Sequence, residues 1–201
     1  MRKSPRQARS RETVERIVTA GRQVLVADGY DAFSTNRVAT AAGVSPGSLY
    51  QYFPDKAAIL DVVIDRYWTE VADSVAASLS DRITELGPGM VRATADALVT
   101  ALEADRALLQ VGAAELPLGR NRDRRAALER RVRELATTYL AARPESSHRP
   151  SAAVAAWVVV LAVENLTLRW VLDQPAAVSR EQLLDEIVAL VGGYLLSVPA
   201  S

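Results

Sequence analysis

Residues 45–56 bring together side chains that can hydrogen-bond to a second molecule, in the order Ser-Pro-Gly-Ser-Leu-Tyr-Gln-Tyr-Phe-Pro-Asp-Lys. On a helix that begins at Pro46, successive residues turn by about 100°, which places Leu49 and Phe53 on one side. The other side carries small and polar residues, with Tyr50 at the boundary: Gly47, Ser48, Gln51 and Tyr52. A helix that packs by one face and presents such residues on the other can enter the major groove of DNA.

The polar residues of this stretch differ in the DNA group that each could contact. Gln51 can read the edge of a base. The hydroxyls of Tyr50 and Tyr52 and the ammonium group of Lys56 can reach phosphate oxygens. The alternative is an ordinary aromatic core cluster, since aromatic residues at helical spacing are usually buried. The adjoining turn, the helix cap and the basic residues favour the DNA-binding interpretation over a buried aromatic cluster.

Two chain breaks would position this helix. Gly43 allows the positive φ of a sharp turn, Ser45 can cap the next helix, and Pro46 fits its first position. Pro54 cannot continue a helix, so we expect the helix to cover residues 46–53.

Three further helices are predicted around these breaks. Apolar residues spaced three to four apart predict a helix over residues 8–28 that stops at Gly29. A short helix is predicted from Thr35 to Ala42, with Ser34 as its N-cap. A long helix follows its cap, Asp55. The apolar stripe of that helix comprises Leu60, Val63, Tyr67, Val71 and Val75.

The beginning of the chain is basic, although the 201 residues together carry no net charge. Residues 1–56 hold nine Lys or Arg and five acidic residues, and five of the bases precede the first acid, Glu12. Such an arm is expected where a chain touches a polyanion. On charge alone, a solvated tail explains the pattern equally well.

The composition argues against several classes of function. With 49% hydrophobic and 24% charged residues, the chain is typical of an ordinary soluble globular protein. It has no Cys and a single His, His148, which leaves no thiol nucleophile and no imidazole cluster for a metal. A G-x-S-x-G elbow and a phosphate loop are also lacking. We therefore expect no enzyme, no metal and no cofactor.

The apolar segments do not predict membrane insertion. No signal-peptide core follows the basic start, and the longest apolar run, residues 152–163, is too short to cross a bilayer. We expect a cytoplasmic protein without membrane contact.

Three stretches between Gln7 and about Tyr67 are specific in their order and spacing: GYDAFSTNRVATAAGVS, LYQYF and DKAAIL. In these the chain resembles the tetracycline-repressor (TetR) family of bacterial transcription regulators. The resemblance implies an all-α fold of about nine helices. It also implies a three-helix helix-turn-helix DNA-binding domain over residues 1–54 and a helical ligand-binding and dimerisation domain over residues 55–201.

The resemblance further implies which residues meet DNA. The second helix would begin at residues that contact the DNA backbone: Ser34, Thr35 and Asn36. The recognition turn and helix would contribute Ser45, Pro46, Gly47, Ser48, Tyr50, Gln51 and Tyr52. Lys56 matches the family's phosphate-contacting lysine. Family members often carry more basic or bulky residues where this chain has Gly47 and Ser48, so the resemblance does not extend to base preference.

The last two predicted helices, residues 151–173 and 179–198, are unusually apolar, with AAVAAWVVVLAV leaving no polar face over several turns. A helix that is apolar all round must be covered on all sides, and a second subunit supplies that cover most easily. We therefore expect a homodimer through residues 151–198, as in TetR-like proteins, and hence a palindromic double-stranded operator.

The same half offers candidates for a small-molecule site, which is usually a mostly apolar cavity with a few polar groups. The candidates are Tyr67, Trp68, Val71, Tyr139, Trp157, Glu164 and Asn165. For Glu164, as for Arg169, pairing across a dimer interface is an equal alternative, because buried charges need partners.

We interpret the chain as a ligand-responsive, DNA-binding regulator, most simply a repressor released from its operator by a small apolar effector. The alternative is an all-helical small-molecule carrier or dimeric interaction protein that does not bind DNA specifically. Salt-dependent binding to a duplex would separate the two.

Overall fold

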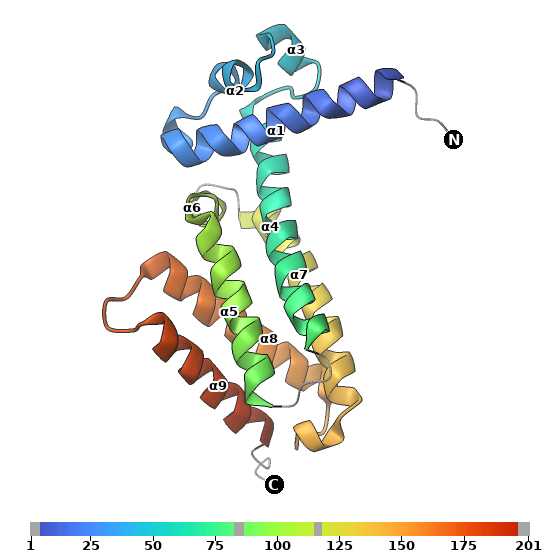
Figure 1. The fold of residues 1–201 in the computed structure, drawn as a ribbon, viewed down its shortest axis with the longest axis vertical. Helices are drawn as coiled ribbons and strands as arrows, with labels where there is room; N and C mark the ends of the chain where they lie inside the picture. Colours follow the sequence, from blue (N-terminus) through green and yellow to red (C-terminus); the bar gives the residue numbers. More distant parts are fainter. Residues whose placement is uncertain (1–4, 83–86, 115–117, 197–201) are drawn as a thin grey trace. The chain divides into compact units, whose positions relative to one another are not determined.

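The computed structural model describes residues 5–82, 87–114 and 118–196. Within these ranges every regular element is helical, so the predicted all-α fold is confirmed. The elements are α1 (Pro5–Ala32), α2 (Thr35–Ala42), α3 (Pro46–Tyr50), α4 (Lys56–Asp81), α5 (Pro88–Ala104), α6 (Arg106–Ala114), α7 (Leu118–Ala141), the 3-10 turn η1 (Pro144–Ser146), α8 (Ala152–Asp173) and α9 (Arg180–Leu196). Figure 1 shows their order along the chain.

The chain divides into two compact units. The first contains residues 1–67 and 107–117, and the second contains residues 68–106 and 118–201. The helix α4 supplies its first turns to the first unit and its remaining turns to the second. A functional boundary between residues 54 and 55 stays a prediction.

In the first unit, α1 is longer than the predicted helix but is interrupted where the sequence indicates. Gly29 has a φ of 77° and a ψ of 175°, which separates a short last turn from the main part of α1. Only glycine adopts such a backbone conformation readily. The chain can therefore turn back, and α2 packs against α1.

The core of this unit depends on a close approach between α1 and α4. A Cβ atom at Gly21 would lie 3.0 Å from a methyl group of Ile59 and 3.3 Å from one of Val63. Both partners are buried, as are Leu25 on α1 and Leu49 on α3. Residues with side chains at position 21 would push the helices apart, so this glycine sets their spacing.

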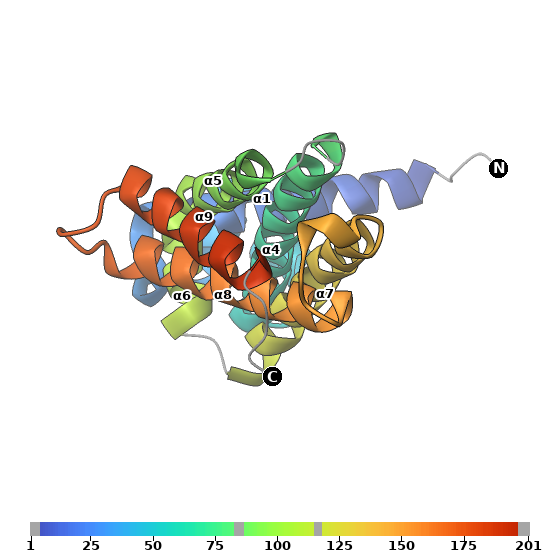
Figure 2. The same cartoon turned by 90° about the horizontal axis from the view of Figure 1, so that it is seen from below.

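The second unit is a layered bundle. Its helix α8 packs against α5, α7 and α9, and α5 also packs against α9. Figures 1 and 2 show α9 running beside α8 and α5, with α7 on the other side of α8. Because α8 touches three helices, its apolar sequence is partly covered within one chain.

Two arginines join α5 and α9 in opposite directions. Arg92 on α5 forms ion pairs with Glu181 and Asp185 on α9. Arg180 on α9 forms ion pairs with Asp96 at 2.7 Å and Glu103 at 2.9 Å on α5. Both arginine side chains are about one-third exposed, so the ion pairs lie at the rim of the helix contact.

The helix α8, 22 residues long, is long and apolar enough to cross a membrane by length and composition, and 28% of its most apolar window is buried. It is longer than the apolar run of residues 152–163, because Glu164 and Asn165 continue the helix. Its buried side comprises Ala155, Ala156, Thr167, Leu168 and Val171. Large apolar side chains remain exposed on it: Val154, Trp157 and Leu166.

Candidate functional site

The turn between α2 and α3 has the caps that the sequence predicts. Gly43 adopts a left-handed conformation with a φ of 64°. Its amide donates to the carbonyl of Thr40 at 3.1 Å, and the amide of Val44 donates to that of Ala39 at 3.0 Å. Ser45 Oγ then accepts a hydrogen bond from the amide of Ser48 at 3.1 Å. Backbone and side chain together therefore fix the angle at which α3 leaves α2.

The helix α3 buries one face, as expected. Leu49 is fully buried and Phe53 is 6% exposed. Tyr50 is the most exposed aromatic side chain of this region, at 52%. Its hydroxyl lies 3.1 Å from Thr35 Oγ1, which joins the end of α3 to the start of α2.

The helix α3 is shorter than predicted, because it ends at Tyr50 rather than at Phe53. The amides of Tyr52 and Phe53 both donate to the carbonyl of Leu49, at 2.9 and 3.0 Å, which closes a turn. Gln51 therefore lies at the end of the helix, where the chain already turns towards α4.

The start of α4 is capped by Asp55 and carries the positively charged side chain of Lys56. The amide of Ala58 donates to Asp55 Oδ1 at 2.8 Å, which confirms Asp55 as the cap. Lys56 lies in the first turn, with its ammonium nitrogen 5.1 Å from the centre of the Tyr30 ring. This contact holds the cation while leaving Lys56 exposed.

The eleven residues predicted to contact DNA all lie in the first unit, and none of them is buried. Exposed are Asn36, Ser45, Pro46, Gly47, Tyr50, Gln51 and Lys56, and half-buried are Ser34, Thr35, Ser48 and Tyr52. They come from the starts of α2 and α4, from α3 and from the turns around it. Their contacts with DNA stay a prediction. The basic arm lies in part outside the described residues.

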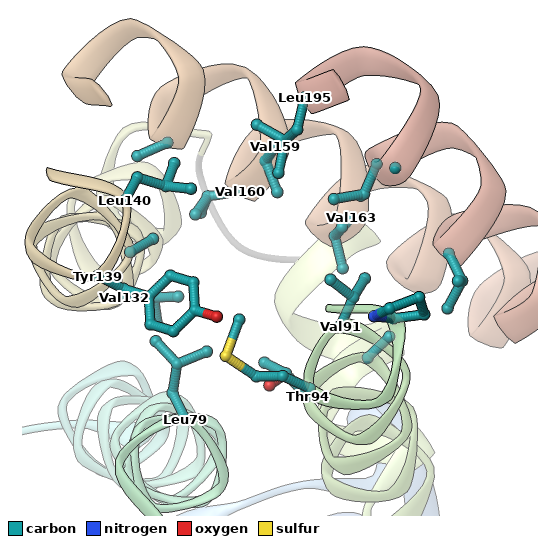
Figure 3. A pocket seen from close by; sticks show the side chains of 18 of the residues that line it. Leu79, Val91, Thr94, Val132, Tyr139, Leu140, Val159, Val160, Val163 and Leu195 are labelled. Carbon is teal, nitrogen blue, oxygen red and sulfur yellow. The ribbon is translucent and has the colours of Figure 1, made fainter. Parts of the chain in front are cut away.

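A second candidate site is a cavity of about 380 Å³ within the second unit. Its size falls in the range of about 300–1,000 Å³ that is usual for small-molecule sites. Apolar side chains from α4, α5, α7, α8 and α9 form most of its wall, among them Leu79, Val91, Val132, Val160 and Leu195. Figure 3 shows these side chains surrounding the cavity, with the hydroxyl of Tyr139 pointing into it.

Two of the seven predicted ligand residues, Tyr139 and Glu164, line this cavity. Three others, Tyr67, Trp68 and Val71, are buried at other places and do not line it. Trp157 is 47% exposed, and Asn165 is exposed with its amide bonded to the carbonyl of Leu161. On α4 the lining residues lie one to two turns beyond the expected ones: Val75 and Leu79.

Several cavity residues escaped sequence reasoning because they are apolar residues at ordinary helical spacing. Val91, Ala95 and Leu98 recur on one face of α5, a pattern that equally describes a filled core. The one unusual signal is Gly192 within α9, since glycine disfavours a helix. A Cβ atom there would meet no other atom within 4 Å.

Three carboxylates lie on the described wall of the cavity, those of Glu129, Glu145 and Glu164. Glu129 is paired with Arg133 at 3.1 Å, and Arg133 does not line the cavity. Across the residues with described placement, no three His, Asp or Glu side chains gather as they would around a metal ion.

In the comparison with known proteins, two parts of the chain each match a known protein family. Residues 17–63 match the family described as bacterial regulatory proteins, tetR family. Residues 88–195 match the tetracyclin repressor-like C-terminal domain. The first match contains the turn, α3 and the start of α4, and the second contains most of the cavity wall.

Two curated relatives are similar over part of their length. The HTH-type transcriptional repressor DrrR1 of Streptomyces coeruleorubidus is 34% identical over 86 residues, which are 43% of this chain and 28% of that protein. The nucleoid occlusion factor SlmA of Glaesserella parasuis is 36% identical over 59 residues, 29% of either chain. The chain thus spans less than a third of the length of these relatives.

Solved structures are similar over nearly the whole chain. The fatty acid degradation regulator FadR of Bacillus halodurans has a TM-score of 0.64 at 18% identity, covering 96% of this chain and 97% of that one. FadR of Bacillus subtilis in complex with stearoyl-CoA has a TM-score of 0.62 at 16% identity, covering 92% and 99%. The multidrug binding protein EbrR, complexed with imidazole, has a TM-score of 0.64 at 23% identity, covering 94% and 97%. At these identities the similarity shows the shared fold.

Proposed function

Because this chain belongs to the TetR family of bacterial regulatory proteins, we propose that it is a homodimeric repressor that a small, mainly apolar effector releases from its operator. Regulators of this family bind DNA operators and small-molecule effectors, usually as dimers. The observation that carries the proposal is the exposed polar side of α3 and of the turn that follows it, since Leu49 and Phe53 are buried on the other side within the family's DNA-binding region.

On this proposal the exposed residues have two roles. Gln51 reads a base edge in the major groove. Tyr50, Tyr52 and Lys56 contact phosphates, which fixes the orientation of α3 without specifying sequence. The capped turn supports both roles, because it holds the start of α3 rigidly.

The dimer would form through residues 151–198. Exposed large apolar side chains gather on this segment: Val154, Trp157, Leu166, Leu190 and Leu196. A second copy of the chain is a better cover than a lipid bilayer, because Arg169 on α8 is 73% exposed and a charged side chain within a bilayer costs about 2.5–3.5 kcal/mol. We accordingly place the protein in the cytoplasm.

A two-fold dimer presents two α3 helices to a palindromic operator, about 34–36 Å apart. An effector that fits one dimer state better than the other shifts the population towards that state. The helix α4 is the proposed lever, since it is one helix with Lys56 at its start and the cavity residues Val75 and Leu79 towards its end.

The test is selection of bound duplexes from a random pool, followed by a screen for compounds that release the selected duplex. A palindromic consensus, bound with a steep salt dependence, is expected. Selection of no sequence over the random pool would contradict the proposal and favour the alternative, a helical carrier or interaction protein.

A further inference from the structure

We propose that the effector is an uncharged, mainly apolar molecule with one hydrogen-bonding group that pairs with Thr94 Oγ1 in the cavity wall. This inference rests on the proposed function, because it specifies the ligand of the same cavity. The charge of the wall and the hydrogen bonding of Thr94 carry it independently of each other.

Thr94 differs from other threonines in the helices of this chain. The hydroxyls of six helical threonines donate to the carbonyl four residues earlier, at 2.7–3.0 Å: Thr13, Thr40, Thr100, Thr137, Thr138 and Thr167. Thr94 Oγ1 is buried and forms no hydrogen bond with the protein. A buried hydroxyl without a partner is unfavourable by about 1–3 kcal/mol.

The position of Thr94 indicates a role for this hydroxyl in ligand binding. Thr94 lies on α5 and lines the cavity, as Tyr139 does from α7 (Figure 3). Rotation of the Thr94 side chain about its Cα–Cβ bond would turn the hydroxyl towards a ligand in the cavity, which can then supply the missing partner. Because a hydroxyl both donates and accepts, the ligand group can be a hydroxyl, a carbonyl or an amine.

The charges on the described part of the cavity wall disfavour an anionic ligand. None of the described lining residues is Lys, Arg or His, and three of them are glutamates. An anionic head group held here would be buried beside like charges, without a cation to pair with. The wall therefore disfavours fatty acids and acyl-CoA thioesters, although one solved structure of similar fold contains stearoyl-CoA.

A cation is not favoured either, although carboxylates are present. Glu129 already pairs with Arg133, Glu164 engages in other interactions, and Glu145 is exposed. The rest of the wall is almost entirely apolar, which makes desolvation of a cation unfavourable. An uncharged compound avoids both penalties.

The experiment uses four compounds that share one ring system: naphthalene, 2-naphthol, 2-naphthoate and 2-naphthylmethylammonium. At pH 7 a phenol is neutral, so 2-naphthol differs from naphthalene by one hydrogen-bonding group. Calorimetric titration of the full-length protein gives each affinity. We expect 2-naphthol to bind about 2- to 12-fold more tightly than naphthalene, as one hydrogen bond provides. We expect both ions to bind more weakly than 2-naphthol, 2-naphthoate by at least about tenfold.

Thr94→Val and a matched control test the role of the hydroxyl. Thr94→Val should abolish the advantage of 2-naphthol over naphthalene and leave the affinity for naphthalene unchanged. Thr167→Val removes the hydroxyl of a fully buried threonine on α8 that does not line the cavity, so it should preserve the advantage.

The possible negative results distinguish an error in the proposed ligand chemistry from an error in the proposed effector site. Naphthoate or the ammonium compound binding as tightly as 2-naphthol, or an unchanged preference in Thr94→Val, would overturn the inference and leave the cavity as an effector site. Binding of none of the four compounds would overturn the inference and the effector site together. Operator selection, measured on the same protein, reports separately on DNA binding.

Discussion

The hydroxyl of Tyr50 at the end of α3 lies 3.1 Å from the hydroxyl of Thr35 at the start of α2. This hydrogen bond spans the turn that Gly43 and Ser45 build, so two residues predicted to meet the DNA backbone are held at a fixed separation. Their arrangement precedes DNA binding, which lowers the entropy that binding must overcome.

The first prediction concerns this pair. Tyr50→Phe and Thr35→Val should each weaken operator binding by about 3- to 10-fold, because each removes one hydrogen bond and one phosphate contact. The double variant should lose less affinity than the sum of the two single losses, since the hydrogen bond that the two residues share is lost only once. Fluorescence anisotropy with a labelled duplex measures all three. Strictly additive losses would show that the two hydroxyls act independently.

The second prediction separates base reading from phosphate contact. Gln51→Ala should reduce discrimination between the selected operator and single-base variants by about 1–3 kcal/mol. Lys56→Ala should weaken binding to every duplex and lower the slope of log K against log salt by about one. If Lys56→Ala changed the preferred sequence and Gln51→Ala changed the salt slope, the assigned roles would be reversed.

The third prediction tests the dimer. Trp157→Arg should weaken dimerisation by at least about 30-fold, because a tryptophan in the centre of an interface commonly contributes about 2 kcal/mol or more. Val26→Arg on α1 is the control, since Val26 is also 47% exposed but lies in the first unit. Sedimentation equilibrium over a range of concentrations gives the dimer affinity. An unchanged affinity in Trp157→Arg would move the interface away from this part of α8.

A fourth prediction concerns stability in the absence of ligand. Thr94→Val replaces a buried hydroxyl that lacks a protein partner, so it should stabilise the protein by about 1 kcal/mol and raise Tm by about 2–4 °C. Thr167→Val should not stabilise it, because its hydroxyl bonds to the carbonyls of Val163 and Glu164. Calorimetric melting distinguishes the two. Equal shifts would mean that the Thr94 hydroxyl is satisfied in solution.

The fifth prediction is a pH dependence. Arg66 donates two hydrogen bonds of 2.6 Å to Glu15, which lower the pKa of that carboxyl below its usual value. A lowered folded-state pKa stabilises the protein above the unfolded pKa of about 4.3, and this stability is lost as pH falls through the folded pKa. Because Glu15 is 59% exposed, the contribution at pH 7 should be below about 1 kcal/mol. Urea unfolding of Glu15→Gln should show a deficit at pH 7 that shrinks as the pH falls below the unfolded pKa of about 4.3.

The sequence predicted the parts of the molecule that depend on local chemistry. Gly29 and Gly43 adopt the positive φ that their positions suggest, and Ser45 and Asp55 cap the helices that follow them. Such features are decided within a few residues, so they can be read directly. The end of α3 was predicted three residues too late, because a turn closed by hydrogen bonds to Leu49 carries the chain on to Pro54.

The cavity could not be predicted in the same way. Where α8 is apolar on every side, periodicity does not say which residues face a neighbouring helix, a ligand or solvent. Trp157 and Tyr139 are both large aromatic residues, yet one is 47% exposed and the other lines the cavity. Only the packing of α5, α7, α8 and α9 distinguishes them.

The ion pairs that run in both directions between α5 and α9 couple the positions of these two helices. Arg92 reaches from α5 to α9, and Arg180 reaches from α9 back to α5. Sliding α9 along α5 by one turn, about 5.4 Å, would disrupt this set of ion pairs. We therefore expect a ligand that displaces α5 at Thr94 to displace α9 as well, and with it the exposed Leu190 and Leu196.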